Sequence, residues 1–181
     1  TATFARYGIP LDQVSQFRPW FLMVMVEALH QQTLGYFSDQ SLDIYFLNKA
    51  EGKTIIGLET PVFQATLFAH FSPALEKMLL LTTLNSNLTK ETEELVTAWW
   101  QGDLARIESN IFAKQEQDPI YLEYNEKIYF SRNRRIAAKI NSFLANGGTY
   151  FVLLPCGHFF GKESILELLK AEGITVERLA I

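Results

Sequence analysis

The sequence predicts a helix-rich α/β fold with a small, mostly parallel β-sheet. Apolar residues recur at helical spacing along most of the chain, and prolines stand repeatedly where such runs begin. Three short apolar runs have the length and composition of buried strands. The last two of these runs flank a helical run, which is the pattern of a β-α-β unit with parallel strands and a right-handed crossover.

The helices are predicted from apolar periodicity and from the residues that can start or end them. Pro61 and Pro73 directly follow Thr60 and Ser72, whose hydroxyls can accept a hydrogen bond from the first helical turn. Gly173 is expected to end the last helix in the left-handed conformation. The predicted helices cover residues 19–31, 41–51, 61–70, 73–85, 90–101, 103–116, 119–128, 132–146 and 162–172.

The predicted strands cover residues 54–58, 149–154 and 175–179. Sheets average about 5–6 strands, and a parallel sheet is normally covered on both faces, so three strands are few for so much helix. The sequence therefore predicts either a small sheet wrapped by helices or, as we favour, a sheet completed by further strands. An N-terminal segment upstream of Thr1 or a second copy of the chain would supply them.

No linker, low-complexity tract or internal repeat divides the chain, so residues 1–181 are predicted to form a single domain. The sequence starts at Thr1 with neither an initiator methionine nor a signal peptide, and we expect the domain to be N-terminally incomplete.

Composition and charge exclude several classes of protein. With 48% hydrophobic and 20% charged residues the chain is globular, and its formal net charge of −4 argues against a nucleic-acid partner. The single cysteine, Cys156, cannot form an intrachain disulfide. No stretch approaches the roughly 18 consecutive apolar residues of a membrane span, so no transmembrane segment is expected in this chain.

Polar residues whose side chains could take part in catalysis or bind a metal lie next to the predicted strands. Glu59 immediately follows the first strand, and His158 follows the second after a short turn. Arg132 and Asn133 open the helix that precedes the second strand, so they should return to the same edge of the sheet, where parallel α/β folds bind ligands. A carboxylate and an imidazole could share a divalent metal or act as base and acid around a water molecule. An arginine beside them could bind a substrate carboxylate or stabilise developing negative charge.

Each of these residues also has a purely structural interpretation. Glu59 could simply lie before the helix that starts at Pro61, where the helix dipole favours a carboxylate, and composition alone favours that interpretation. His158 could equally be a hydrogen-bonded loop histidine. Arg132 and Asn133 at a basic helix end would usually be solvated surface residues.

Five short motifs in a fixed order resemble the TraB/GumN family, which includes PrgY- and YbaP-like proteins and is related to the Tiki metalloproteases. Together they span nearly the whole chain, which makes the resemblance specific although each motif alone is weak. The motifs are Pro19-Trp20, Gly52-Lys53 with Gly57-Leu58-Glu59, Ala98-Trp99 with Gly102-Asp103, Ser131-Arg132-Asn133, and Gly157-His158 through Gly173-Ile174-Thr175-Val176.

This resemblance implies a fold similar to that of EreA- and ChaN-like proteins and a metal-dependent hydrolase ancestry. In the Tiki branch, two GxxH motifs and a glutamate form the metal-binding and catalytic set, which acts on peptide bonds with manganese or cobalt. Carried over by position, Glu59 and His158 would bind the metal. Together with Arg132 and Asn133, which match the family's arginine–asparagine pair, they would form the catalytic set.

Two departures from the family pattern bear on the metal. Pro155 replaces the leading glycine of the second GxxH motif, and the first GxxH motif would lie before Thr1. His30 and His70 do not replace it, because neither has a glycine three residues before it and both are predicted to be structural helix residues. Since catalytic zinc-like sites normally use three protein ligands, we expect this chain alone to bind divalent metal weakly.

The leading functional hypothesis is therefore a metal-dependent hydrolase, peptidase-like and acting on a peptide or small molecule outside the cytoplasm, as a periplasmic protein, a lipoprotein or a secreted protein. The alternative is a non-catalytic module that binds a peptide or protein partner in the same crevice. A complete ligand set is needed only by the enzyme.

Overall fold

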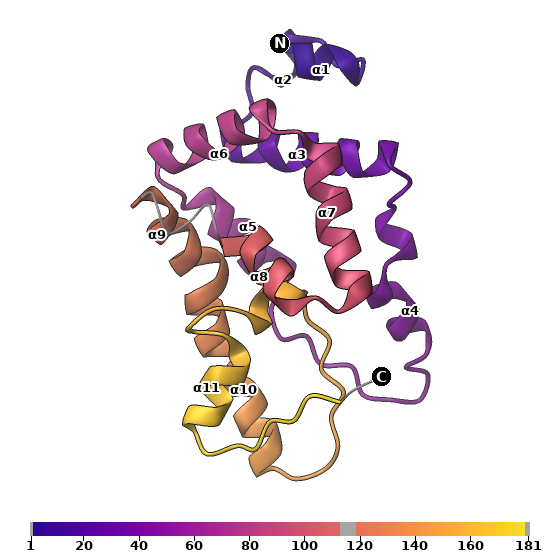
Figure 1. Ribbon diagram of the computed structural model, residues 1–181, viewed down its shortest axis with the longest axis vertical. Coiled ribbons are helices and arrows are strands. Elements are labelled where there is room, and N and C mark those ends of the chain that lie inside the picture. The colour runs from indigo at the N-terminus through magenta and orange to yellow at the C-terminus, as the bar shows by residue number, and fades with distance from the viewer. Residues whose placement is uncertain (1, 113–118, 180–181) are drawn as a thin grey trace. The chain divides into compact units, whose positions relative to one another are not determined.

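The computed structural model describes residues 2–112 and 119–179, which form helices joined by turns and irregular segments (Figure 1). The chain divides into two compact units, Thr1–Asn110 and Ile111–Ile181, and the architecture of each is given separately. No helix in the described ranges has the length and apolar character that crossing a bilayer requires, in agreement with the sequence.

The predicted α/β fold is wrong, because no described residue belongs to a β-strand. Residues 54–57, 149–155 and 174–179 are irregular, without the hydrogen-bonded ladder that defines a sheet. Several of their apolar side chains face solvent, including Ile55, Phe151 and Leu179, which are 63%, 72% and 81% exposed. A short apolar run indicates that a segment prefers an extended backbone. A strand also needs a second segment to pair with, and the run itself does not specify that segment. The predicted β-α-β unit and the sheet edge that was to gather the site are therefore absent from the described chain.

The described residues of the first unit form eight α-helices, whose bounds are set largely by prolines and capping side chains, and a short 3-10 helix (Ser38–Gln40). The α-helices are α1 (Ala2–Arg6), α2 (Leu11–Val14), α3 (Pro19–Thr33), α4 (Leu42–Asn48), α5 (Pro61–Ala69), α6 (Pro73–Asn85), α7 (Leu88–Gln101) and α8 (Leu104–Phe112), the last of which leads into the second unit. The predicted caps are confirmed: Thr60 Oγ1 accepts from Phe63 N at 3.1 Å and Ser72 Oγ accepts from Leu75 N at 3.2 Å. The predicted end of α8 beyond Phe112 lies outside the described residues.

The core of the first unit lies where α3 packs along α6, with α5 and α7 also packed against α3 (Figure 1). Val26 of α3 and Leu75 of α6 are fully buried. At the N-terminal side, the short helices α1 and α2 add Phe4 and Val14 to a cluster around Val26. Burying such apolar side chains is the main force that holds these helices together.

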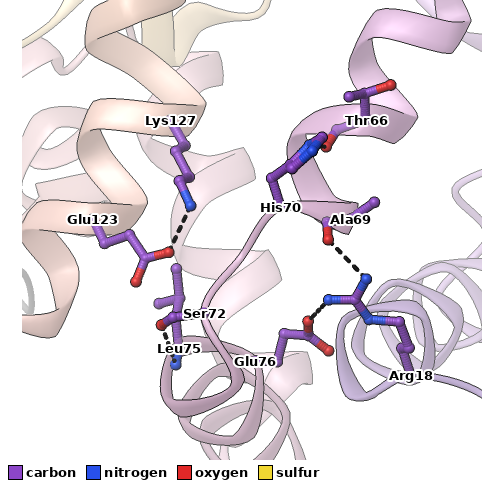
Figure 2. Close-up of polar contacts among 9 residues, drawn as sticks. All are labelled: Arg18, Thr66, Ala69, His70, Ser72, Leu75, Glu76, Glu123 and Lys127. Atoms are coloured by element: carbon purple, nitrogen blue, oxygen red, sulfur yellow. Dashed lines mark hydrogen bonds and ion pairs between the residues drawn. The ribbon is translucent and has the colours of Figure 1, made fainter.

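One arginine joins three of these helices (Figure 2). Arg18, the residue before α3, forms an ion pair with Glu76 in the first turn of α6 and donates from Nη1 to Ala69 O, at the end of α5, over 2.7 Å. Glu76 is only 3% exposed, so its carboxylate depends on this partner.

The second unit contains one long helical segment and a short helix packed against it. The segment comprises α9 (Ile120–Asn125), a π-helix (Glu126–Phe130) and α10 (Ser131–Ala145), in direct succession. A one-turn 3-10 helix (Cys156–Phe159) precedes α11 (Ile165–Ala171), which packs on α10 (Figure 1). The predicted role of Gly173 is confirmed, since it has a φ of 81° and Ile174 N donates back to Leu169 O at 3.1 Å.

Candidate functional site around His158

His158 lies in the 3-10 turn that follows Pro155, inside the second unit. Pro155 has an extended backbone, and its carbonyl oxygen accepts a hydrogen bond from His158 N at 3.1 Å, which closes the turn. The turn brings the imidazole inward, and His158 is only 2% exposed. The proline in place of the family's glycine is therefore compatible with a tight turn that buries the histidine.

Asn133 is the hydrogen-bond partner of that histidine. His158 Nδ1 lies 2.6 Å from Asn133 Oδ1, and Asn133 Nδ2 donates to the backbone oxygen of Glu163 at 2.7 Å. Asn133 is completely buried in α10. Two of the four predicted site residues, which lie 25 positions apart in the sequence, are thus brought together in one buried pair.

Tyr129 forms another wall of the site. Its ring stands edge-on to the His158 ring, with 5.9 Å between the centroids. It also lies so close to the residue before His158 that a Cβ on Gly157 would be 2.8 Å from Tyr129 Cε1, so any other residue at position 157 would force the Tyr129 ring to move. Burial raises the pKa of Tyr129, an effect that a hydrogen bond to Tyr124 reduces. The phenol is therefore neutral at physiological pH.

The π-helix Glu126–Phe130 carries Tyr129 and leads directly into the α10 turn that holds Asn133. Such segments are rare and frequently occur at functional sites, because the wider turn changes which side chains share a face of the helix. Sequence reasoning missed both the π-helix and Tyr129, having placed a helix break between residues 128 and 132. The absence of glycine or proline from residues 120–145 is the signal that could have revealed a continuous helix.

Arg132 lies in the first turn of α10, partly buried, and its Nη1 donates to Ile128 O at 3.0 Å. Its positive charge also lies near enough to Tyr129 to favour the phenolate slightly, against the larger effect of burial on that pKa. Two residues on, Arg134 forms ion pairs with Glu126 and Glu163, which tie the π-helix and the segment before α11 to α10.

Glu59 belongs to the first unit, so the structure places it only against its own surroundings. It is partly exposed, directly before the cap of α5, and Gln64 Nε2 donates to its Oε2 at 3.3 Å. This is the setting expected of a carboxylate at a helix N-terminus. The prediction that Glu59 shares a cleft with His158, Arg132 and Asn133 stays a prediction.

The donor set does not by itself fit a divalent cation. Among the residues that the structure describes, no three His, Cys, Asp or Glu side chains are grouped closely enough to hold one ion. The contacts of His158 include the amide oxygen of Asn133 and the ring of Tyr129, neither of which is the anionic or imidazole donor that manganese and cobalt favour.

Comparison with known proteins finds a matching family and several similar proteins. A sequence model of the TraB/PrgY/gumN family matches residues 1–178. A metalloprotease TIKI homolog from Amphimedon queenslandica is 26% identical over 92% of this chain, and metalloprotease TIKI2 from Danio rerio is 26% identical over 88%. An uncharacterized protein from Treponema pallidum (strain Nichols) is 22% identical over 90%.

The chain spans 38% of the length of the sponge relative, 36% of the fish relative and 52% of the Treponema relative. No solved structure matches. The family match covers nearly the whole sequence and includes every motif noted above, so this chain belongs to the TraB/PrgY/gumN family.

Proposed function

We propose that the protein is a hydrolase that cleaves peptide bonds and that His158 belongs to its active site. The observation that carries this proposal is the buried hydrogen bond between His158 and Asn133, because it joins two motifs that lie far apart in the sequence. The similarity to proteins named as metalloproteases supports the choice of peptide bonds as the substrate.

In this proposal the imidazole of His158 takes a proton from water as the water oxygen attacks the peptide carbonyl carbon. The new carbon–oxygen bond forms, the carbon–nitrogen bond breaks, and the proton passes to the amine that leaves. Arg132 would stabilise the negative charge that develops on the carbonyl oxygen. The resemblance adds Glu59 to the catalytic set. The resemblance adds manganese or cobalt to this scheme, but the described donors do not form its site, so the proposed steps rest on side chains alone.

The alternative proposal is a non-catalytic module that binds a peptide or a protein partner. This alternative is favoured by the burial of His158, which is only 2% exposed. Its hydrogen bond to Asn133 also holds the 155–161 loop against α10. A fastening role would need no access for substrate. In both proposals the protein acts outside the cytoplasm. Fractionation of cells that express the tagged protein would test this location.

Replacing His158 by Gln tests the enzyme proposal, and His30 offers a matched control. His30 is also buried, at 8% exposure, and is also hydrogen-bonded through its ring, but it lies in the first unit, in α3. The full-length protein would be assayed with a library of internally quenched peptides, with and without added Mn²⁺ or Co²⁺. We expect His158→Gln to lower the rate by about 100-fold or more, as loss of a general base does, and His30→Gln to leave the rate unchanged.

Equal rates for the wild type and His158→Gln would contradict the proposal, as would an equal loss in both variants. If the wild-type protein cleaves no peptide but binds a subset of the library saturably, the binding module is the correct function.

A further inference from the structure

The orientation of the Asn133 amide can be read from its two hydrogen bonds. Its nitrogen faces the carbonyl oxygen of Glu163 at 2.7 Å, and its oxygen faces His158 Nδ1 at 2.6 Å. Turning the amide around would place its oxygen against the oxygen of Glu163, two acceptors with no proton between them. The oxygen of Asn133 is therefore the atom that faces the histidine.

This orientation determines the protonation of the imidazole. An amide oxygen can only accept a hydrogen bond, so the proton in the His158–Asn133 bond must be carried by Nδ1. In the neutral ring the lone pair then resides on Nε2. Histidines that act as bases or ligands are commonly held in this way, with one nitrogen donating to a fixed acceptor and the other kept basic.

The acceptor is itself held in place by neighbouring elements. Asn133 is 0% exposed within α10, and hydrogen bonds at both ends of its amide hold the side chain in one orientation. Glu163, whose carbonyl oxygen holds the amide, is tied to α10 through the ion pair of its carboxylate with Arg134. The next residue, Ser164, is 2% exposed and caps α11 by accepting from Glu167 N at 3.2 Å. The contacts run from the start of α11 through Glu163 and Asn133 to His158.

We propose that Asn133 is a positioning residue that holds His158 as the Nδ1–H tautomer, which makes Nε2 the nitrogen that takes the proton during hydrolysis. The tautomer follows from the hydrogen bonds alone, whereas the role of Nε2 rests on the proposed function. The prediction is that replacing Asn133 by an apolar side chain of similar shape changes the tautomer, and that replacing it by another acceptor does not.

The test is long-range ¹H–¹⁵N NMR of the full-length protein labelled on histidine, at a pH where the ring is neutral. Comparison with His158→Gln identifies the His158 signals among those of the three histidines of residues 1–181. We expect a pyrrole-like shift for Nδ1 and a pyridine-like shift for Nε2. Asn133→Asp still accepts a hydrogen bond from Nδ1, although it loses the donor to Glu163 O, so it should keep this pattern. Asn133→Leu should shift the population toward the Nε2–H tautomer. The kcat of Asn133→Leu should fall about tenfold or more, with KM little changed.

A pyridine-like shift for Nδ1 in the wild type would overturn the proposal, and this outcome does not depend on whether either variant folds. An unchanged Nδ1–H tautomer in Asn133→Leu would overturn the role of Asn133. If the wild type shows the expected tautomer but no hydrolysis, the tautomer assignment stands, while the proposed function and the proton-accepting role of Nε2 fail.

Discussion

Two histidines are buried among the described residues, and their partners differ in what they dictate. His30 Nδ1 lies 2.9 Å from Tyr7 Oη, and its Nε2 lies 3.1 Å from Thr89 Oγ1. A hydroxyl can donate or accept, so these partners satisfy either tautomer of His30. The amide oxygen of Asn133 can only accept, and it therefore fixes the tautomer of His158. The hydrogen-bonding chemistry of the partner therefore distinguishes His30, whose tautomer is left open, from His158, whose protonated nitrogen is determined.

Glu27 is a partly buried carboxylate in α3 whose pKa is shifted by its surroundings. Burial raises its pKa above the usual value, the nearby charge of Glu91 raises it further, and a hydrogen bond from Thr83 Oγ1, at 3.0 Å, opposes both effects. The folded protein therefore binds the Glu27 proton more tightly than the unfolded chain does. This contribution to stability is fully present below the unfolded pKa and is lost as the pH rises through the folded pKa.

Replacing Glu27 by Gln should raise the melting temperature at neutral pH, because Gln keeps an acceptor for Thr83 without a charge to desolvate. The gain should shrink as the pH is lowered to the range where Glu27 is protonated in both states. Thermal unfolding measured across pH tests this, with Glu93→Gln as a control that makes the same charge change at an exposed position of α7. A gain that persists undiminished at low pH, or that Glu93→Gln reproduces, would argue against desolvation as the cause.

At the scale of elements, the sequence predicted helices wherever local chemistry determines them. Pro61 and Pro73 stand at the first positions of α5 and α6, and Gly173 follows α11, all as predicted. Such signals act within one helical turn, so a single sequence contains them. The short helices α1 and α2 were missed because they are four or five residues long and too short to display a period.

Pairing between distant segments could not be predicted in the same way. The run at 149–154 has the composition of a strand, yet the described structure does not pair it with another segment in a sheet, and the correct inference from its residues was only an extended backbone. The π-helix was missed because the prediction ended one helix at residue 128 and began another at Arg132, whereas the structure continues the helix through residues 129–131.

The contacts of Arg18 with Glu76 and Ala69 lead to a prediction about the stability of the packing among α3, α5 and α6. Arg18→Ala would leave the buried Glu76 without its cation and Ala69 O without a donor, so we expect a loss of about 1–3 kcal/mol in the free energy of unfolding. The half-exposed position of Arg18 keeps this below the cost for a fully buried pair. Arg18→Lys should recover only part of it, since a single ammonium cannot reproduce the two-pronged contact.

The control for this prediction is Lys90→Ala, which removes an exposed ion pair with Glu94, 3.9 Å apart along one helix. Such pairs contribute about 0.5 kcal/mol or less. Denaturant unfolding of the three variants gives the comparison. If Arg18→Ala costs no more than Lys90→Ala, then Arg18 does not join these helices in the way proposed.

At the scale of the whole molecule, the candidate site was predictable only in part. The resemblance supplied the order of the motifs, and Asn133 and His158 do meet in the second unit. Order along a chain does not provide distances, however, and the sheet edge invoked to gather the residues is absent from the described chain. Glu59, in the first unit, therefore remains a predicted member of the site. Tyr129 had no recognised motif and emerged only from its contacts with Gly157 and His158.

The helical architecture as a whole can be tested by hydrogen exchange. Ile55, Ile56, Val152 and Leu153 lie in irregular segments, and none of their amides donates a backbone hydrogen bond within the described residues. Amides without such bonds exchange quickly, whereas those inside packed helices such as α10 exchange only when the structure opens. We therefore expect these four amides to exchange within the earliest time points while the interior of α10 stays protected.

The comparison must be made on residues 1–181 and on the full-length protein, because a strand partner supplied by other residues would protect the same amides. Slow exchange at Ile55 and Val152 in the 1–181 chain would mean that a ladder exists there after all, and the sheetless architecture would be wrong. Slow exchange only in the full-length protein would show instead that these segments gain partners from residues outside 1–181. Fast exchange in both would mean that these segments are not paired in a sheet in either protein. Apolar side chains on them, such as those of Ile55 and Phe151, are 63% and 72% exposed.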